Sequence, residues 1–184
     1  MLLDQSKVFG IGLNKTGTTT LGTCLGHLNY KHTSVSLKLL KQIKRGQYED
    51  LFRMVEQYDS FADWPWPLVY KQLDFKYPDS KFILTVRKDS RTWFNSLLRH
   101  ADKIKTTKFR KLVYGYAMPH NYKDEHIAFY EKHNREVCNY FAKRPDKLLV
   151  ICWETGSGWK ELCSFLNKDI PDITLPHKNK ATQG

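Results

Sequence analysis

A lysine, glycines and a run of threonines lie close together near the beginning of the chain. A short apolar run leads into Gly12, Lys15 and Gly17, and a helical pattern begins at the threonines that follow. In a loop of this kind, backbone N–H groups and a helix N-terminus face an anion, and the lysine adds a full positive charge. The residue types and their order therefore predict a phosphate-type anion site within residues 8–21.

The loop resembles the phosphate-binding loop of ATP-binding proteins, whose pattern G-x-x-x-x-G-K-[ST] places lysine directly after the second glycine. Gly12 and Gly17 have that spacing, but Thr18 stands in the lysine position, and the lysine is Lys15. A lysine two residues before Gly17 reaches a phosphate from a different side. Residues 14–19, Asn-Lys-Thr-Gly-Thr-Thr, instead resemble the 5′-phosphosulfate loop of sulfotransferases that use 3′-phosphoadenosine-5′-phosphosulfate (PAPS).

This resemblance implies a role for each residue of the loop. Lys15 is expected to neutralise the charge that grows on the oxygen bridging to the leaving phosphate. PAPS would be the donor and 3′,5′-ADP (PAP) the product, with no metal, because the lysine and the helix dipole supply the positive charge. The 5′-phosphosulfate would be held by Asn14, Lys15, Thr16, Gly17, Thr18, Thr19 and Thr20.

An arginine follows a second apolar run. Residues 81–86 predict a buried strand, and Arg87 stands at its carboxyl end, where doubly wound sheets bind ligands. In the sulfotransferases that the chain resembles, such an arginine and a serine on the next helix hold the 3′-phosphate of PAPS. The family usually places the serine eight residues after the arginine, whereas Ser96 stands nine after Arg87. Ser96 is the expected partner and Ser90 the alternative; an ion pair with Asp89 is the alternative role of Arg87.

Asp63 is the candidate acid–base residue. It stands two residues before Pro65, the offset at which soluble members of the same family commonly carry a histidine as general base. A carboxylate can accept the proton of an acceptor hydroxyl as that oxygen attacks sulfur. The alternative is a structural role as a helix N-cap or in an ion pair at a helix entry. The neighbouring Trp64 and Trp66 are expected in the core, with the acceptor pocket as their alternative place.

The last third of the chain also resembles the family. Trp153 follows a predicted strand, and the resemblance implies that it contacts the adenine, since bases stack favourably on aromatic faces. The alternative is a tryptophan buried at a strand end. Residues 175–179, Leu-Pro-His-Lys-Asn, match an ending that the family places near the nucleotide.

The composition predicts one globular domain over residues 1–184. Hydrophobic residues make up 41% of the chain, and the formal net charge of +11 favours anionic partners. The four cysteines show no C-x-x-C spacing and are expected to be reduced. No apolar run resembles a signal peptide or is long enough to span a bilayer, so a cytoplasmic location is expected.

Predicted strands alternate with predicted helices along the chain. This order predicts an α/β fold, a three-layer sandwich with a central parallel sheet like that of the P-loop NTPases. The expected strands are residues 7–13, 60–62, 81–86 and 148–152, and the expected helices are residues 18–28, 34–45, 48–58, 68–77, 89–104, 124–141 and 158–166.

Three functions remain open at this stage. The first is a PAPS-dependent sulfotransferase acting on a hydroxyl or amine of a small-molecule or glycan acceptor, neutral or acidic. The second is a P-loop kinase or NTPase, and the third is a non-catalytic module that binds anions or nucleic acid. The basic residues 99–111 fit a solvated helix face better than an acidic-acceptor site, and nucleic acid is the least favoured partner.

Overall fold

Parallel strands form the central sheet of the computed structural model, which describes residues 6–104 and 108–176. Within these residues the sheet has five strands in the order β2-β3-β1-β4-β5. The strand β1 (Val8–Gly10) is central, between β3 (Ser60–Phe61) and β4 (Lys81–Thr85). The outer strands are β2 (His32–Thr33) and β5 (Leu148–Ile151). Because all pairs are parallel, the carboxyl ends of the strands meet at one edge, where ligands bind in such sheets.

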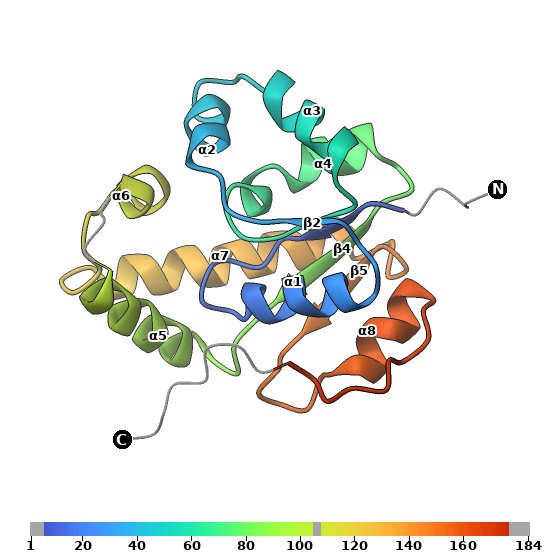
Figure 1. Ribbon diagram of the computed structural model, residues 1–184. Helices are drawn as coiled ribbons and strands as arrows, with labels where there is room; N and C mark the ends of the chain where they lie inside the picture. Colours follow the sequence, from blue (N-terminus) through green and yellow to red (C-terminus); the bar gives the residue numbers. More distant parts are fainter. Residues whose placement is uncertain (1–5, 105–107, 177–184) are drawn as a thin grey trace.

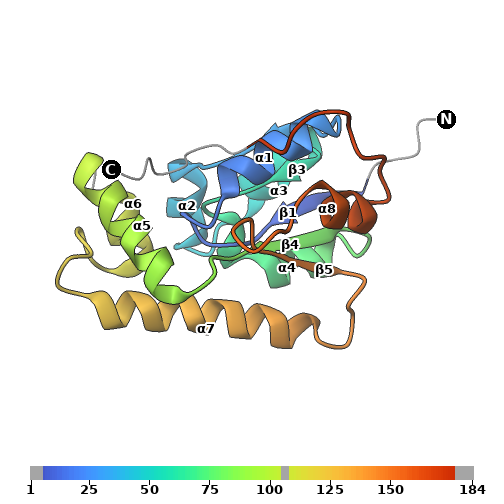
Figure 2. The same cartoon turned by 90° about the horizontal axis from the view of Figure 1, so that it is seen from below.

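Helices cover both faces of the sheet, as Figure 2 shows. One face packs against α1 (Thr18–His27) and α8 (Trp159–Leu166). The other packs against α3 (Glu49–Gln57), α4 (Tyr70–Lys76) and α7 (Lys123–Phe141). This is the three-layer α/β sandwich that the sequence predicts.

The two faces are separated by the alternation of side chains along each strand. Val8 and Ile83 belong to the cluster under α1 and α8, whereas Phe9 and Phe82 belong to the cluster under α7. Phe9 stacks on Phe61 and Phe82, with ring centroids 4.9 and 5.5 Å apart. Each buried aromatic side chain contributes about 1.5–3 kcal/mol of hydrophobic stabilisation. The central strand is therefore fixed from both faces, and so is the loop that follows it.

Three further helices gather beyond the carboxyl edge of the sheet: α2 (Leu37–Ile43), α5 (Ser90–Lys103) and α6 (Lys108–Tyr114). Figure 1 shows α5 and α6 together at one end of the molecule. The α5 helix begins where the sequence predicts, because the Asp89 carboxylate accepts a hydrogen bond from Thr92 N at 2.6 Å. Among the described helices, none is long and apolar enough to cross a membrane.

Several expected boundaries are wrong. The helix expected over residues 34–45 is α2, which begins after Ser36, whose hydroxyl accepts a hydrogen bond from Leu39 N. The helix expected over residues 68–77 is a 3₁₀ turn, η1 (Trp66–Leu68), followed by α4. Neither β2 nor α6 was expected: β2 has two residues, too few for a periodic pattern, and α6 has only seven.

Candidate active site

The β1–α1 loop, residues 11–17, has an unusual backbone that its neighbours hold in place. Lys15 and Gly17 both have positive φ angles, 68° and 94°, and for lysine this conformation carries a strain energy. The buried Thr16 hydroxyl donates to Leu13 O at 2.6 Å and bonds the Thr85 hydroxyl at 2.6 Å. The Thr16 side chain is therefore directed into the protein, where it fixes the loop to β4.

The loop is also tied to the helices at the carboxyl edge. Asn14 O accepts a hydrogen bond from Trp93 Nε1 of α5 at 2.9 Å. Asn14 Oδ1 accepts one from the Tyr114 hydroxyl of α6 at 2.6 Å. Asn14 thus anchors the loop, and Tyr114, which no sequence motif marks, is one of its supports.

The start of α1 offers free donors. Gly17 is the N-cap residue of this helix and provides no side-chain cap, so the first N–H groups are left for another acceptor. Thr19 is exposed on this first turn, whereas Thr18 and Thr20 are buried. A helix N-terminus in this state attracts an anion.

Lys15 lies at the centre of a cluster of charged side chains. Partial burial lowers the pKa of Lys15, and the Asp63 carboxylate opposes this shift. The neighbouring cations Arg87, Arg99 and Lys103 lower the pKa of Lys15 further. The loop, the end of β4 and α5 therefore supply four cations near the Asp63 carboxylate, which follows β3, and this arrangement suits a ligand with several negative charges.

Asp63 follows β3 and lies near Lys15. Its Oδ2 accepts a hydrogen bond from the Thr18 hydroxyl at 3.1 Å, and its Oδ1 accepts one from Trp64 N at 2.8 Å. Burial raises the pKa of Asp63, while these hydrogen bonds and the Lys15 charge oppose the shift. Asp63 does not cap a helix, because η1 begins after Pro65. A half-buried carboxylate with a raised pKa, beside a lysine, has the properties of a general base.

The neighbouring tryptophans lie in the core, as expected. Trp66 is fully buried against Phe9 and Phe61. Trp64 is 3% exposed and packs edge-on against Tyr114, with ring centroids 6.0 Å apart.

Arg87 leaves β4 toward the loop and forms an ion pair that the sequence did not indicate. Its Nε and Nη2 donate to the two Glu154 carboxylate oxygens at 2.9 and 2.5 Å, and its Nη1 donates to Lys15 O at 3.2 Å. Glu154 also accepts a hydrogen bond from Lys88 N at 3.1 Å. The alternative pairing with Asp89 is wrong, because Asp89 caps α5.

Ser96 lies partly exposed on α5, and Ser90 is the first residue of that helix. The helical spacing of Ser96, Arg99 and Lys103 places them on one face of α5. The charges of Arg99 and Lys103 on this face lower the pKa of Lys15.

Trp153 lies against the loop from the other side. A Cβ atom at Gly17 would lie 2.4 Å from Trp153 Cδ1, so only glycine permits this close approach. The buried indole Nε1 has no hydrogen-bond partner among the described residues. His177 and Asn179 of the matched C-terminal ending lie outside the described residues.

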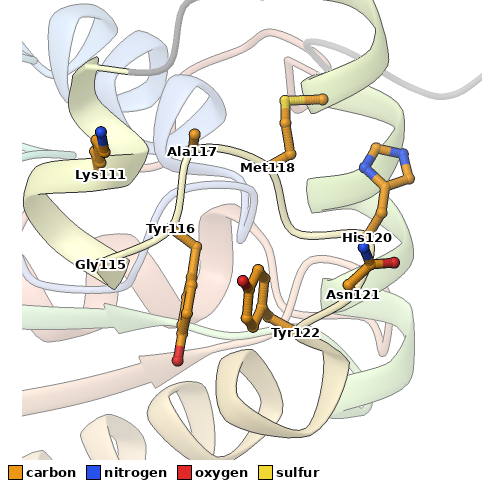
Figure 3. Close-up of a pocket in the computed structure, with 8 residues that line it drawn as sticks. All are labelled: Lys111, Gly115, Tyr116, Ala117, Met118, His120, Asn121 and Tyr122. Atoms are coloured by element: carbon orange, nitrogen blue, oxygen red, sulfur yellow. The ribbon is translucent and has the colours of Figure 1, made fainter.

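A cavity of about 330 Å³ lies between α6 and the start of α7. Figure 3 shows Tyr116 and Tyr122 side by side on its wall, with ring centroids 3.6 Å apart. Tyr116 and Tyr114 both pack against His126, at 5.7 and 4.9 Å. A chain of contacts through Tyr116, His126 and Tyr114 thus links the cavity wall to Asn14. Within residues 6–104 and 108–176, no group of three or more His, Cys, Asp or Glu is arranged to hold a metal.

Comparison with known proteins adds two findings. A family model described as a sulfotransferase domain matches residues 7–183. A curated protein from Aspergillus versicolor, "Ava biosynthesis cluster protein M", is 24% identical over 214 aligned residues, which cover 93% of this chain and 80% of that protein.

Proposed function

Because the sulfotransferase-domain match spans residues 7–183, the chain belongs to the sulfotransferase family, and we propose that PAPS is its donor. The acceptor is a hydroxyl or amine of a small molecule or glycan. The observation that carries the proposal is the contact between two anion-binding elements: Arg87 donates to the backbone oxygen of Lys15. One ligand can therefore reach both elements, as the 5′-phosphosulfate and the 3′-phosphate of PAPS require.

The donor groups at Arg87 fit a phosphate. Arg87 Nε, Arg87 Nη2 and Lys88 N converge on one carboxylate, that of Glu154, within 3.1 Å. A guanidinium fork with an added N–H also matches the oxygens of a phosphate, which it binds in two-pronged fashion. ATP carries no phosphate at the ribose 3′ position, so this set of donors favours PAPS over ATP.

The β1–α1 loop and Lys15 would stabilise the charge of the reaction. PAPS supplies an activated sulfuryl group whose leaving group is a phosphate oxygen. The first N–H groups of α1 and the Lys15 ammonium hold that oxygen and its growing negative charge. The loop that carries these groups is set before any ligand binds, because Thr16 and Asn14 already fix its backbone. Such transfers depend on positioning and charge stabilisation more than on covalent help from the protein.

Asp63 would accept the acceptor's proton. As the acceptor oxygen or nitrogen forms its bond to sulfur, the bond from sulfur to the phosphate oxygen breaks, and that oxygen keeps the electron pair. The proton released from the acceptor passes to the Asp63 carboxylate. Thr18 and Trp64 N hold the two carboxylate oxygens, so the base is oriented before the acceptor arrives.

A transfer assay with [35S]PAPS tests this function. Phenols, alcohols, amines and monosaccharides, each in neutral and carboxylated forms, are offered as acceptors to the wild type, Lys15→Ala and Lys143→Ala. Lys143 is an exposed lysine after the end of α7 and serves as the matched control. We expect a labelled product from the wild type and the control only. A labelled product formed equally by Lys15→Ala, or no labelled product from any acceptor class, would contradict the proposal.

A further inference from the structure

We propose that Glu154 competes with the 3′-phosphate of the nucleotide for Arg87. In this account the Glu154 side chain leaves when PAPS binds, and its return to Arg87 helps to release PAP. The inference rests on the proposed function, because it takes PAPS and PAP as the ligands of this site.

The geometry of the ion pair is the first support. Both oxygens of the Glu154 carboxylate are bound by the Arg87 fork, and the Lys88 N–H completes the set. The third guanidinium nitrogen, Nη1, donates to Lys15 O. These bonds use three of the five guanidinium N–H groups, and the carboxylate occupies the whole edge formed by Nε and Nη2, which is the edge that binds an anion in two-pronged fashion. A 3′-phosphate that binds this edge must therefore displace the carboxylate.

The position of Glu154 in the chain is the second support. It lies in the β5–α8 connection, where Glu154, Thr155 and Gly156 are exposed. Gly156 has a φ of 98° and nothing within 4 Å of its Cβ position, and the turn is held by local hydrogen bonds to Cys152. The Glu154 side chain can consequently move without disturbing the hydrophobic core.

The neighbouring Trp153 gives a third support. Figure 2 shows the β5–α8 connection beside the start of α1, and the Trp153 indole lies directly against Gly17. Its Nε1 is buried without an acceptor among the described residues, an arrangement that costs free energy until an acceptor arrives. The segment that carries Glu154 thus borders both anion-binding elements, and a nucleotide that meets one of them meets this segment as well.

The competition affects only ligands that carry a 3′-phosphate. PAP must break the pair between Arg87 and Glu154, whereas 5′-ADP leaves it intact. The two side chains are 21% and 31% exposed, so the pair is partly screened by solvent. Removing the Glu154 charge should therefore tighten PAP binding about two- to fivefold.

Calorimetric titration of PAP and of 5′-ADP tests the inference in the wild type, Glu154→Gln and Glu131→Gln. Glutamine keeps the shape of the side chain and removes its charge. Glu131 is exposed on α7, so Glu131→Gln makes the same change in net charge away from the site. We expect PAP to bind Glu154→Gln about two- to fivefold more tightly than the wild type. The Kd of 5′-ADP should be the same in all three proteins, and Glu131→Gln should bind PAP as the wild type does.

The results that would contradict this inference differ from those that would contradict the proposed function. If the wild type binds PAP in preference to 5′-ADP, but Glu154→Gln binds PAP equally or more weakly, the competition is wrong and the donor site stands. Equal tightening of both nucleotides would show a general charge effect and would also overturn the competition. A wild type that does not bind PAP would overturn both.

Discussion

Gly12→Ala should disrupt the β1–α1 loop, because the protein backbone leaves no room for a methyl group there. A Cβ atom at Gly12 would lie 2.1 Å from Thr85 Oγ1, 2.4 Å from Thr85 O and 2.7 Å from Thr85 N. Two of these three atoms belong to the backbone of β4, which lies in the buried centre of the sheet. Relief requires either β1 and β4 to separate or the loop to move.

The size of the effect follows from these distances. Overpacking in a well-packed core costs about 1–3 kcal/mol and sometimes more. The Gly12 contacts are shorter than any ordinary nonbonded approach and involve backbone, so we expect a loss of about 3 kcal/mol or more. In a domain of this length each kcal/mol lowers the melting temperature by about 2–4 °C, which gives a decrease of roughly 6–12 °C.

The assay is thermal unfolding with and without PAP, for the wild type, Gly12→Ala and Gly26→Ala. Gly26 lies in α1 and has nothing within 4 Å of its Cβ position, which makes it the matched control. Alanine is favoured over glycine in a helix by up to about 1 kcal/mol, so Gly26→Ala should be as stable as the wild type or slightly more stable. PAP should stabilise the control and should stabilise Gly12→Ala much less, because movement of the loop breaks the Thr16–Thr85 hydrogen bond.

A Gly12→Ala protein whose free energy of unfolding lies within about 1 kcal/mol of the wild type would refute this reasoning. Such a result would show that β4 can move away from the added methyl group with little loss of stability. Full stabilisation of that variant by PAP would refute the link between the Thr85 contact and the anion site.

Three further predictions concern charged groups. Lys15→Ala should lower kcat/KM about 100-fold or more while the urea midpoint stays near that of the wild type, as steady-state kinetics and denaturation will show. Asp63→Asn should lower kcat about 10²–10⁴-fold without loss of stability. Burial raises the pKa of Asp63, so its ionised form is disfavoured in the native state; the acid limb of the wild-type pH–rate profile should therefore lie above the ordinary aspartate value of about 3.9. Burial also acts to raise the pKa of Asp74, but hydrogen bonds from Arg144 and Tyr140 hold it below its usual value. The stability that Asp74 contributes is thus present above about pH 4 and is lost as the pH falls through the lower native pKa. Asp74→Asn should cost about 2–4 kcal/mol in urea unfolding at pH 7, with little further loss in acid.

The parts of the site that depend on local sequence could be predicted. Lys15 and Gly17 lie in one continuous loop after an apolar strand, and Arg87 lies directly after another. Since parallel strands end at a common edge, these residues had to lie near one another. The structure brings Asp63 to the same place from the end of β3.

The parts that depend on distant contacts could not be predicted. Glu154 meets Arg87 across 67 residues, and Tyr114 meets Asn14 across 100, and neither contact leaves a pattern in the sequence. For Thr16, a distant contact also determines the partner of a residue that the local sequence did mark. Its residue type fits a phosphate-binding hydroxyl, but its partner is Thr85, 69 residues away.

The most direct test of the donor site is calorimetric titration of the wild type with PAP, with 5′-ADP and with ATP–Mg²⁺. Hydrogen bonds to a charged group contribute about 1.5–3 kcal/mol each, so the 3′-phosphate contacts should make PAP bind at least about tenfold more tightly than 5′-ADP, with no metal added. Equal affinity for PAP and 5′-ADP, or tighter binding of ATP–Mg²⁺, would contradict the account.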